Sequence, residues 1–130
     1  MERTLLAIML AAGSLWAGSE FAGRWEGKLD GLPGATLTVK QDKGKFSGSI
    51  IFYLIRKDEQ GVRVDGEANC ELLHVAVQGK HMTFEVRHHV RHDSPEYGPN
   101  VKFVFELTGD GEGLLRNVPD GLSVRMLREP

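Results

Sequence analysis

Apolar and polar residues alternate along most of the chain after residue 20, beginning with the run at residues 21–29. In this run the large apolar residues and the glycines occupy one side of an extended chain, and Arg24, Glu26 and Lys28 occupy the other. A period of two with one apolar face is typical of a half-buried strand. The inward residue at the centre of the run is Trp25, which can bury roughly 200 Å². We therefore expect Trp25 to plug one end of a closed antiparallel sheet.

Further alternating runs follow, separated by short turns. They are residues 35–41, 46–55, 62–72, 81–91, 101–107, 114–118 and 122–128. Many of the 16 glycines and five prolines fall between these runs, and no run has the 3.6-residue period of an amphipathic helix. The pattern predicts an all-β domain, either an antiparallel up-and-down barrel of about eight strands or a β-sandwich. We favour the barrel because an even number of strands can close and leave no open edge.

One run contains a conflict of phase. From Val62 to Leu72 every second residue is apolar or small and would face inward, whereas Leu73 and the valines that follow it are apolar on the opposite phase. One extra residue reverses which side of a strand faces the core. A β-bulge or a break is therefore predicted near Leu72-Leu73-His74.

The same run has a thin inner face, since Gly66, Ala68 and Cys70 are all small. Either bulky neighbours such as Phe84 and Phe103 fill the space, or a ligand-sized cavity lies there. Packed interiors are the usual outcome in proteins. The sequence leaves both alternatives open.

The first residues differ in composition from the rest. Arg3 is followed by the apolar run 5–12, and the small residues Ala17 and Ser19 stand at the −3 and −1 positions of a signal-peptidase site. This order is typical of an export signal. An amphipathic N-terminal helix is an alternative, and the run is short of the about 20 apolar residues that a membrane anchor needs. We expect residues 1–19 to be a signal peptide and residues 20–130 to be one domain that is periplasmic or extracellular and free of the membrane after cleavage.

The charge and the cysteine content limit the classes of partner and chemistry that we expect. The formal net charge is −2, which gives no footprint for nucleic acid or for an anionic membrane surface. The single cysteine, Cys70, cannot form an intrachain disulfide. Its apolar strand position predicts a buried thiol with a raised pKa, which does not suit a nucleophile.

Three short motifs carry a resemblance to a known family. Gly23-x-Trp25, then Leu37-Thr-Val39, then Gly44-Lys-Phe46-Ser-Gly48 resemble the opening of the calycin barrels, the lipocalins and, most closely, avidin-type proteins. The resemblance covers roughly residues 23–50 and implies a barrel. It also implies a late basic residue over the tryptophan, either Arg125 or Arg128, held by a cation–π contact.

The departures from the avidin pattern argue against biotin binding. The polar pair of the avidin-like site falls near Gly27 and Gly31 here, and Ile50 stands where a tyrosine is expected. As a whole, the chain is similar to small exported bacterial proteins. The resemblance therefore implies a fold and leaves the ligand undefined.

The inward aromatic residues suggest a function. We expect the protein to bind a small, largely apolar molecule, with the 92–100 loop as a rim or lid. The expected ligand-binding residues are Trp25, Phe52, Phe84, His88, Tyr97, Phe103 and Phe105. In this interpretation His88 and Tyr97 are the polar groups nearest the mouth of the barrel.

A second hypothesis uses the outer surface. The run 46–55 ends apolar on its outward side, which predicts that this side is covered by a loop, by the chain's terminus, by a partner or by a second copy. The alternative function is a non-catalytic interaction or structural module, with a homodimer formed through an outer patch. The residues of that patch are Ile51, Tyr53, Ile55 and Val104.

No motif predicts catalysis, a metal or a cofactor. His88 and His89 are adjacent and so face opposite sides of a strand, and a site from His88, His92 and a nearby carboxylate lacks converging ligands. There is no Gly-x-Ser-x-Gly turn, and the glycine-rich stretch 109–113 precedes no helix that could take a phosphate. We therefore expect a protein that is not an enzyme.

Overall fold

The computed structural model describes residues 19–29, 32–89, 97–119 and 121–130, with side chains for residues 20–28, 34–87, 98–119 and 121–130. The predicted signal peptide lies outside the described residues apart from Ser19, and so does most of the 92–100 loop. A 3₁₀ turn, η1 (Ser19–Phe21), precedes the strands. The strands are β1 (Gly23–Leu29), β2 (Leu32–Asp42), β3 (Lys45–Asp58), β4 (Gly61–Glu71), β5 (Leu73–Gln78), β6 (His81–His89), β7 (Tyr97–Gly109), β8 (Glu112–Asn117) and β9 (Ser123–Arg128).

All nine strands form one antiparallel, meander-like sheet in the order β4-β3-β2-β1-β9-β8-β7-β6-β5. The all-β prediction is confirmed. The two edge strands, β4 and β5, are consecutive in the chain, and no ladder joins them within the described residues. The sheet is therefore not closed into a barrel, and the expectation of a closed barrel of about eight strands is wrong. The reason is the break between β4 and β5, after which the two strands diverge instead of pairing.

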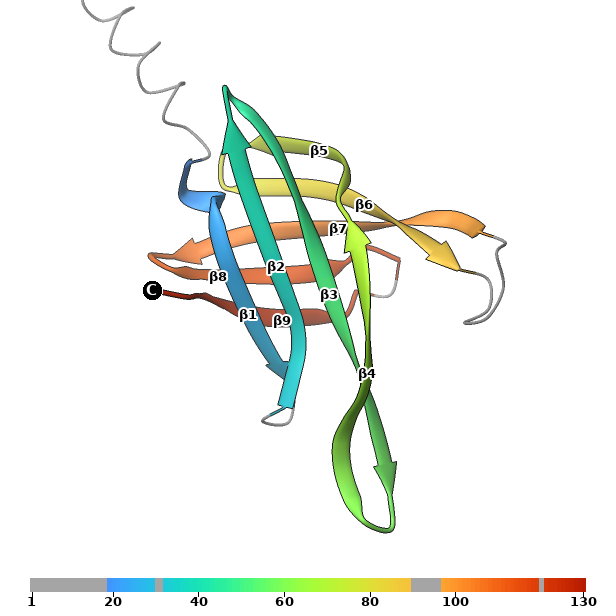
Figure 1. Ribbon diagram of the computed structural model, residues 1–130. Coiled ribbons are helices and arrows are strands. Elements are labelled where there is room, and N and C mark those ends of the chain that lie inside the picture. The colour runs from blue at the N-terminus through green and yellow to red at the C-terminus, as the bar shows by residue number, and fades with distance from the viewer. Residues whose placement is uncertain (1–18, 30–31, 90–96, 120) are drawn as a thin grey trace, which may run out of the picture.

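The sheet folds over on itself, so that its two halves cross. In Figure 1, β1–β4 run steeply and β5–β9 run across them. The halves are hydrogen-bonded where β1 meets β9, over only three residue pairs centred on Glu26 and Leu127. The inner faces of the halves pack together and bury the apolar core. Its members are Phe21, Trp25, Ala35, Leu37, Val39, Ile50, Leu72, Met82, Phe84, Val86, Phe103, Phe105, Leu107, Leu115 and Met126.

The break near Leu72 is confirmed. β4 ends at Glu71 and β5 begins at Leu73, while Leu72 itself is buried. The backbone N–H of Leu72 donates to the carbonyl oxygen of Gly48 at 3.1 Å, and His74 has a φ of 53°. Leu72 thus anchors the chain to β3 at the point where it leaves the first half of the sheet for the second.

A second irregularity in β4 lies outside the prediction. Gly66 pairs with Leu54, but Val64 pairs with Ile55, so Asp65 is an extra residue and the register shifts. A β-bulge of this kind puts the residues before it on the opposite side from the one that the alternation after it predicts. Val62 and Val64 therefore share the face of Ile55 and are 45% and 38% exposed. The expectation that both valines face inward is wrong.

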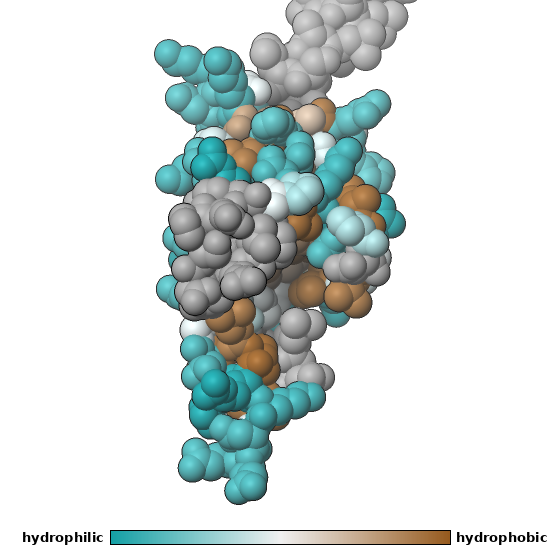
Figure 2. Space-filling model, turned by 90° about the vertical axis from the view of Figure 1, so that its right-hand side faces the viewer, coloured by the Kyte–Doolittle hydropathy of each residue, from teal (hydrophilic) through white to brown (hydrophobic). Residues whose placement is uncertain are grey.

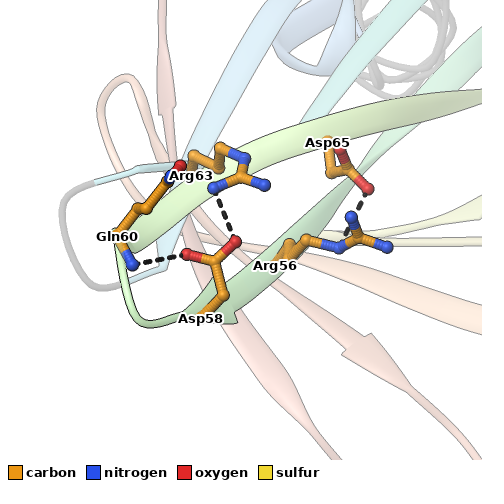
Figure 3. Close-up of polar contacts among 5 residues, drawn as sticks. All are labelled: Arg56, Asp58, Gln60, Arg63 and Asp65. Atoms are coloured by element: carbon orange, nitrogen blue, oxygen red, sulfur yellow. Dashed lines mark hydrogen bonds and ion pairs between the residues drawn. The ribbon is translucent and has the colours of Figure 1, made fainter.

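The β3–β4 hairpin extends beyond the body of the sheet (Figure 1). Because the hairpin passes beyond the second half of the sheet, Leu54 is 43% exposed, although alternation places it on the same inward side of β3 as Phe52. Ion pairs hold the tip (Figure 3): Arg63 Nη1 lies 2.7 Å from Asp58 Oδ2, and Arg56 Nε lies 3.3 Å from Asp65 Oδ2. The N–H of Gln60 donates to Asp58 Oδ1 at 2.9 Å and closes the turn.

Candidate aromatic site between the two halves

Aromatic side chains from both halves meet where the β3–β4 and β6–β7 hairpins diverge. Phe52 comes from β3, Phe84 from β6 and Phe103 from β7. The ring of Phe103 stacks on Phe52, with centroids 5.4 Å apart, and on Phe84, with centroids 5.5 Å apart. Phe84 and Phe103 are buried, whereas Phe52 is half-buried. We call these three side chains the aromatic row, and Phe52 is the member that solvent reaches most.

The small residues predicted on β4 flank this row. Ala68 pairs with Phe52, so the two side chains share a face, and Ala68 is exposed. Cys70 pairs with Ile50 and is half-buried. Partial burial raises the pKa of the Cys70 thiol, as expected, which keeps it protonated and poorly nucleophilic. These small residues of β4 form a thin wall that borders the exposed end of the aromatic row.

Trp25 and Phe105 lie one layer deeper in the core. Trp25 pairs with Leu37, which pairs with Ile50, two residues along β3 from Phe52. Phe105 is two residues along β7 from Phe103, and its ring meets the indole edge to face at 4.9 Å. Both side chains are 0% exposed. The structure thus places these two predicted ligand-binding residues among core contacts and not beside solvent.

Trp25 does not plug a closed sheet, because the sheet is open, but its buried side chain is held by specific contacts. The indole N–H of Trp25 donates to the carbonyl oxygen of Phe21 at 2.9 Å. The guanidinium carbon of Arg128 lies 6.0 Å from the centre of the indole ring, so Arg128, and not Arg125, is the basic residue over the tryptophan. Arg125 instead pairs with Glu112 at 2.7 Å.

The two polar residues expected at the mouth are described only in their backbone. His88 pairs with Gly98, and His89 pairs with Tyr97, at the far end of the β6–β7 hairpin. The side chains of His88 and Tyr97 lie outside the described residues, so their expected role stays a prediction.

The expected outer patch is divided. Ile51, Tyr53 and Ile55 alternate along one face of β3 and are half-buried, and Tyr53 Oη lies 3.1 Å from the hydroxyl of Thr36 in a hydrogen bond. Val104 is on β7, and β2, β1, β9 and β8 lie between it and β3 in the sheet. The four residues do not form one surface.

Sequence reasoning missed an inward polar residue beside the aromatic row. Asn117 on β8 pairs with Phe103, and its Oδ1 atom is buried. Alternation along β8 could have identified this residue, because Leu115, two residues earlier, is a core residue and lies on the same side of the strand. Asn117 has an interaction partner within the chain, and an amide side chain carries both donor and acceptor atoms.

The described residues show no group of three or more His, Cys, Asp or Glu side chains that could hold a metal ion. Within the same part of the chain, no helix has the length and apolar character needed to cross a membrane. Comparisons with protein families, curated proteins and solved structures found no match to this chain.

Proposed function

We propose that the protein is an exported, calycin-like β protein that binds a small, largely apolar ligand at the aromatic row. The observation that carries the proposal is the half-buried ring of Phe52, which ends a stack of three phenylalanines and borders the thin wall at Ala68. Ligand sites are mostly apolar, with a few placed polar groups. Asn117 supplies such a group at the inner side of the row.

Two further observations support parts of the proposal. The contact between Arg128 and Trp25 matches the feature that the calycin resemblance implies, and the composition of residues 1–19 supports export. The raised pKa of the Cys70 thiol argues against a nucleophilic role for this residue.

The test is a titration with the uncharged fluorophore N-phenyl-1-naphthylamine, whose emission rises in apolar surroundings. We expect saturable binding by the protein. The substitution Ala68→Phe places a large side chain beside Phe52 at an exposed position, so it should block the row without unfolding the sheet.

The matched control is Ala76→Phe. Ala76 is an exposed alanine on the other edge strand, β5. We expect Ala68→Phe to weaken binding about tenfold or more, which corresponds to about 1.4 kcal/mol, and Ala76→Phe to leave it unchanged. The proposal fails if the protein does not bind the probe, or if the two variants bind it equally well.

A further inference from the structure

The outer part of the β3–β4 hairpin is a two-stranded ribbon. β4 is an edge strand of the sheet, and in Figure 1 this part of the hairpin stands away from the other strands. Two-stranded ribbons are only marginally stable in water unless a further strand or surface covers them. A partner that covered one face of this ribbon would therefore stabilise it.

One face of the ribbon is apolar at its centre. Cross-strand pairs share a face, and the pairs on this one are Ile55 with Val64, Lys57 with Val62, and Tyr53 with Glu67. The two valines are among the more exposed apolar residues of the described chain, at 45% and 38%. Figure 2 shows apolar surface directly above the hydrophilic tip of the hairpin. We call these six residues the hairpin face.

The opposite face of the ribbon carries Leu54, which is 43% exposed, and charged residues that are paired within the chain. There Arg56 pairs with Asp65, and Arg63 pairs with Asp58 (Figure 3). On the hairpin face, by contrast, Lys57 and Glu67 are exposed and have no ion-pair partner within the described residues. The hairpin face thus combines an uncovered apolar centre with one free charge of each sign.

The positions of these charges make the face self-complementary. Lys57 lies two residues from Ile55 toward the tip, and Glu67 belongs to the pair two residues from Ile55 toward the body. At about 3.3 Å per residue, the backbone positions of Lys57 and Glu67 are each about 7 Å along the strands from the centre. Consider a two-fold axis that lies in the interface and runs across the strands, along the line from Ile55 to Val64. This axis exchanges the tip and body directions of the two copies. It therefore sets the row with Lys57 against the row with Glu67 of the second copy.

We propose that the protein forms a two-fold dimer through the hairpin face. Its apolar centre would be Ile55, Val62 and Val64 from both copies, and its rim would contain two Lys57–Glu67 ion pairs. An apolar centre within a polar rim is the usual anatomy of a protein interface, and a two-fold contact uses the same patch on both subunits. The dimer replaces the divided outer patch and does not depend on ligand binding.

The first test is sedimentation equilibrium of the full chain, with Val62→Lys and Val118→Lys as matched variants. Both valines are 45% exposed, but Val118 lies outside the hairpin. We expect a dimer in the protein and in Val118→Lys. Val62→Lys should weaken association about tenfold or more, because the apolar burial of one valine is lost from each copy. A monomer at all concentrations, or equal effects of the two variants, would overturn the proposal.

The second test is charge reversal, which separates self-association from a general loss of apolar surface. Lys57→Glu brings carboxylates together across the interface, and Glu67→Lys brings ammonium groups together. Each should weaken the dimer by a factor on the order of ten, because two attractive rim contacts become repulsive. The double variant restores opposite charges and should restore the dimer. If either single change leaves the dimerisation constant unchanged, or the double variant stays as weak as the single ones, this arrangement is wrong.

Discussion

Replacing Trp25 by alanine should remove a large part of the stability of the fold. The side chain is 0% exposed, its N–H is bonded to the carbonyl oxygen of Phe21, and its ring contacts Phe105. Burial of roughly 200 Å² at about 25 cal/mol/Å² gives about 5 kcal/mol as an upper bound. Measured truncations of large core aromatics fall at about 3–5 kcal/mol. We therefore expect a loss of about 3–5 kcal/mol in the free energy of unfolding.

Trp25→Phe separates packing from hydrogen bonding. A phenyl ring can keep part of the contact with Phe105, but it leaves the Phe21 carbonyl oxygen without its donor. An unsatisfied buried acceptor costs about 1–3 kcal/mol. The loss should therefore be smaller than that of the alanine variant and still measurable.

The assay is urea denaturation followed by far-ultraviolet circular dichroism, because the substitution removes the tryptophan of residues 20–130. The free energy of unfolding is extrapolated linearly to water. Leu122→Ala is the control, since Leu122 is 71% exposed, and it should change stability by no more than about 0.5 kcal/mol. A loss below about 1 kcal/mol for Trp25→Ala would refute the reasoning that this indole holds the two halves together.

Three further outcomes are expected. Gly48→Ala should cost at least about 2 kcal/mol in the same urea assay, because a Cβ atom would lie 1.9 Å from the Thr38 carbonyl oxygen, whereas Gly44→Ala, with nothing within 4 Å, should cost less; equal losses would contradict this. Because burial raises the pKa of the Cys70 thiol, its alkylation should have a higher pH midpoint than in the urea-unfolded chain. The unfolded thiol loses its proton first, so this group's contribution to stability should fall as pH rises through the unfolded pKa; identical midpoints would count against it. Native mass spectrometry should show a co-purified apolar adduct or a dimer, and a clean, unliganded monomer would argue against both proposals.

Local pattern determined much of the architecture. The alternation around Trp25 predicts a strand with that residue buried, and the structure has both. The phase conflict near Leu72 predicts the break between β4 and β5. The calycin resemblance narrowed the residue over the indole to Arg125 or Arg128. The buried strand and the break could be predicted because a period of two and the order of residues along one strand are local properties of the chain.

Tertiary structure alone decided whether the sheet closes, and which strand ends reach beyond the core. β4 and β5 diverge after Leu72, so a count of strands could not establish closure. The bulge at Asp65 moves Val62 and Val64 to the outer face, and the four strands between β3 and β7 separate Val104 from Tyr53. Parity gives only the side of a strand on which a residue lies. What covers that side depends on strand order, bulges and the crossing of the two halves, which are set by contacts between residues distant in sequence.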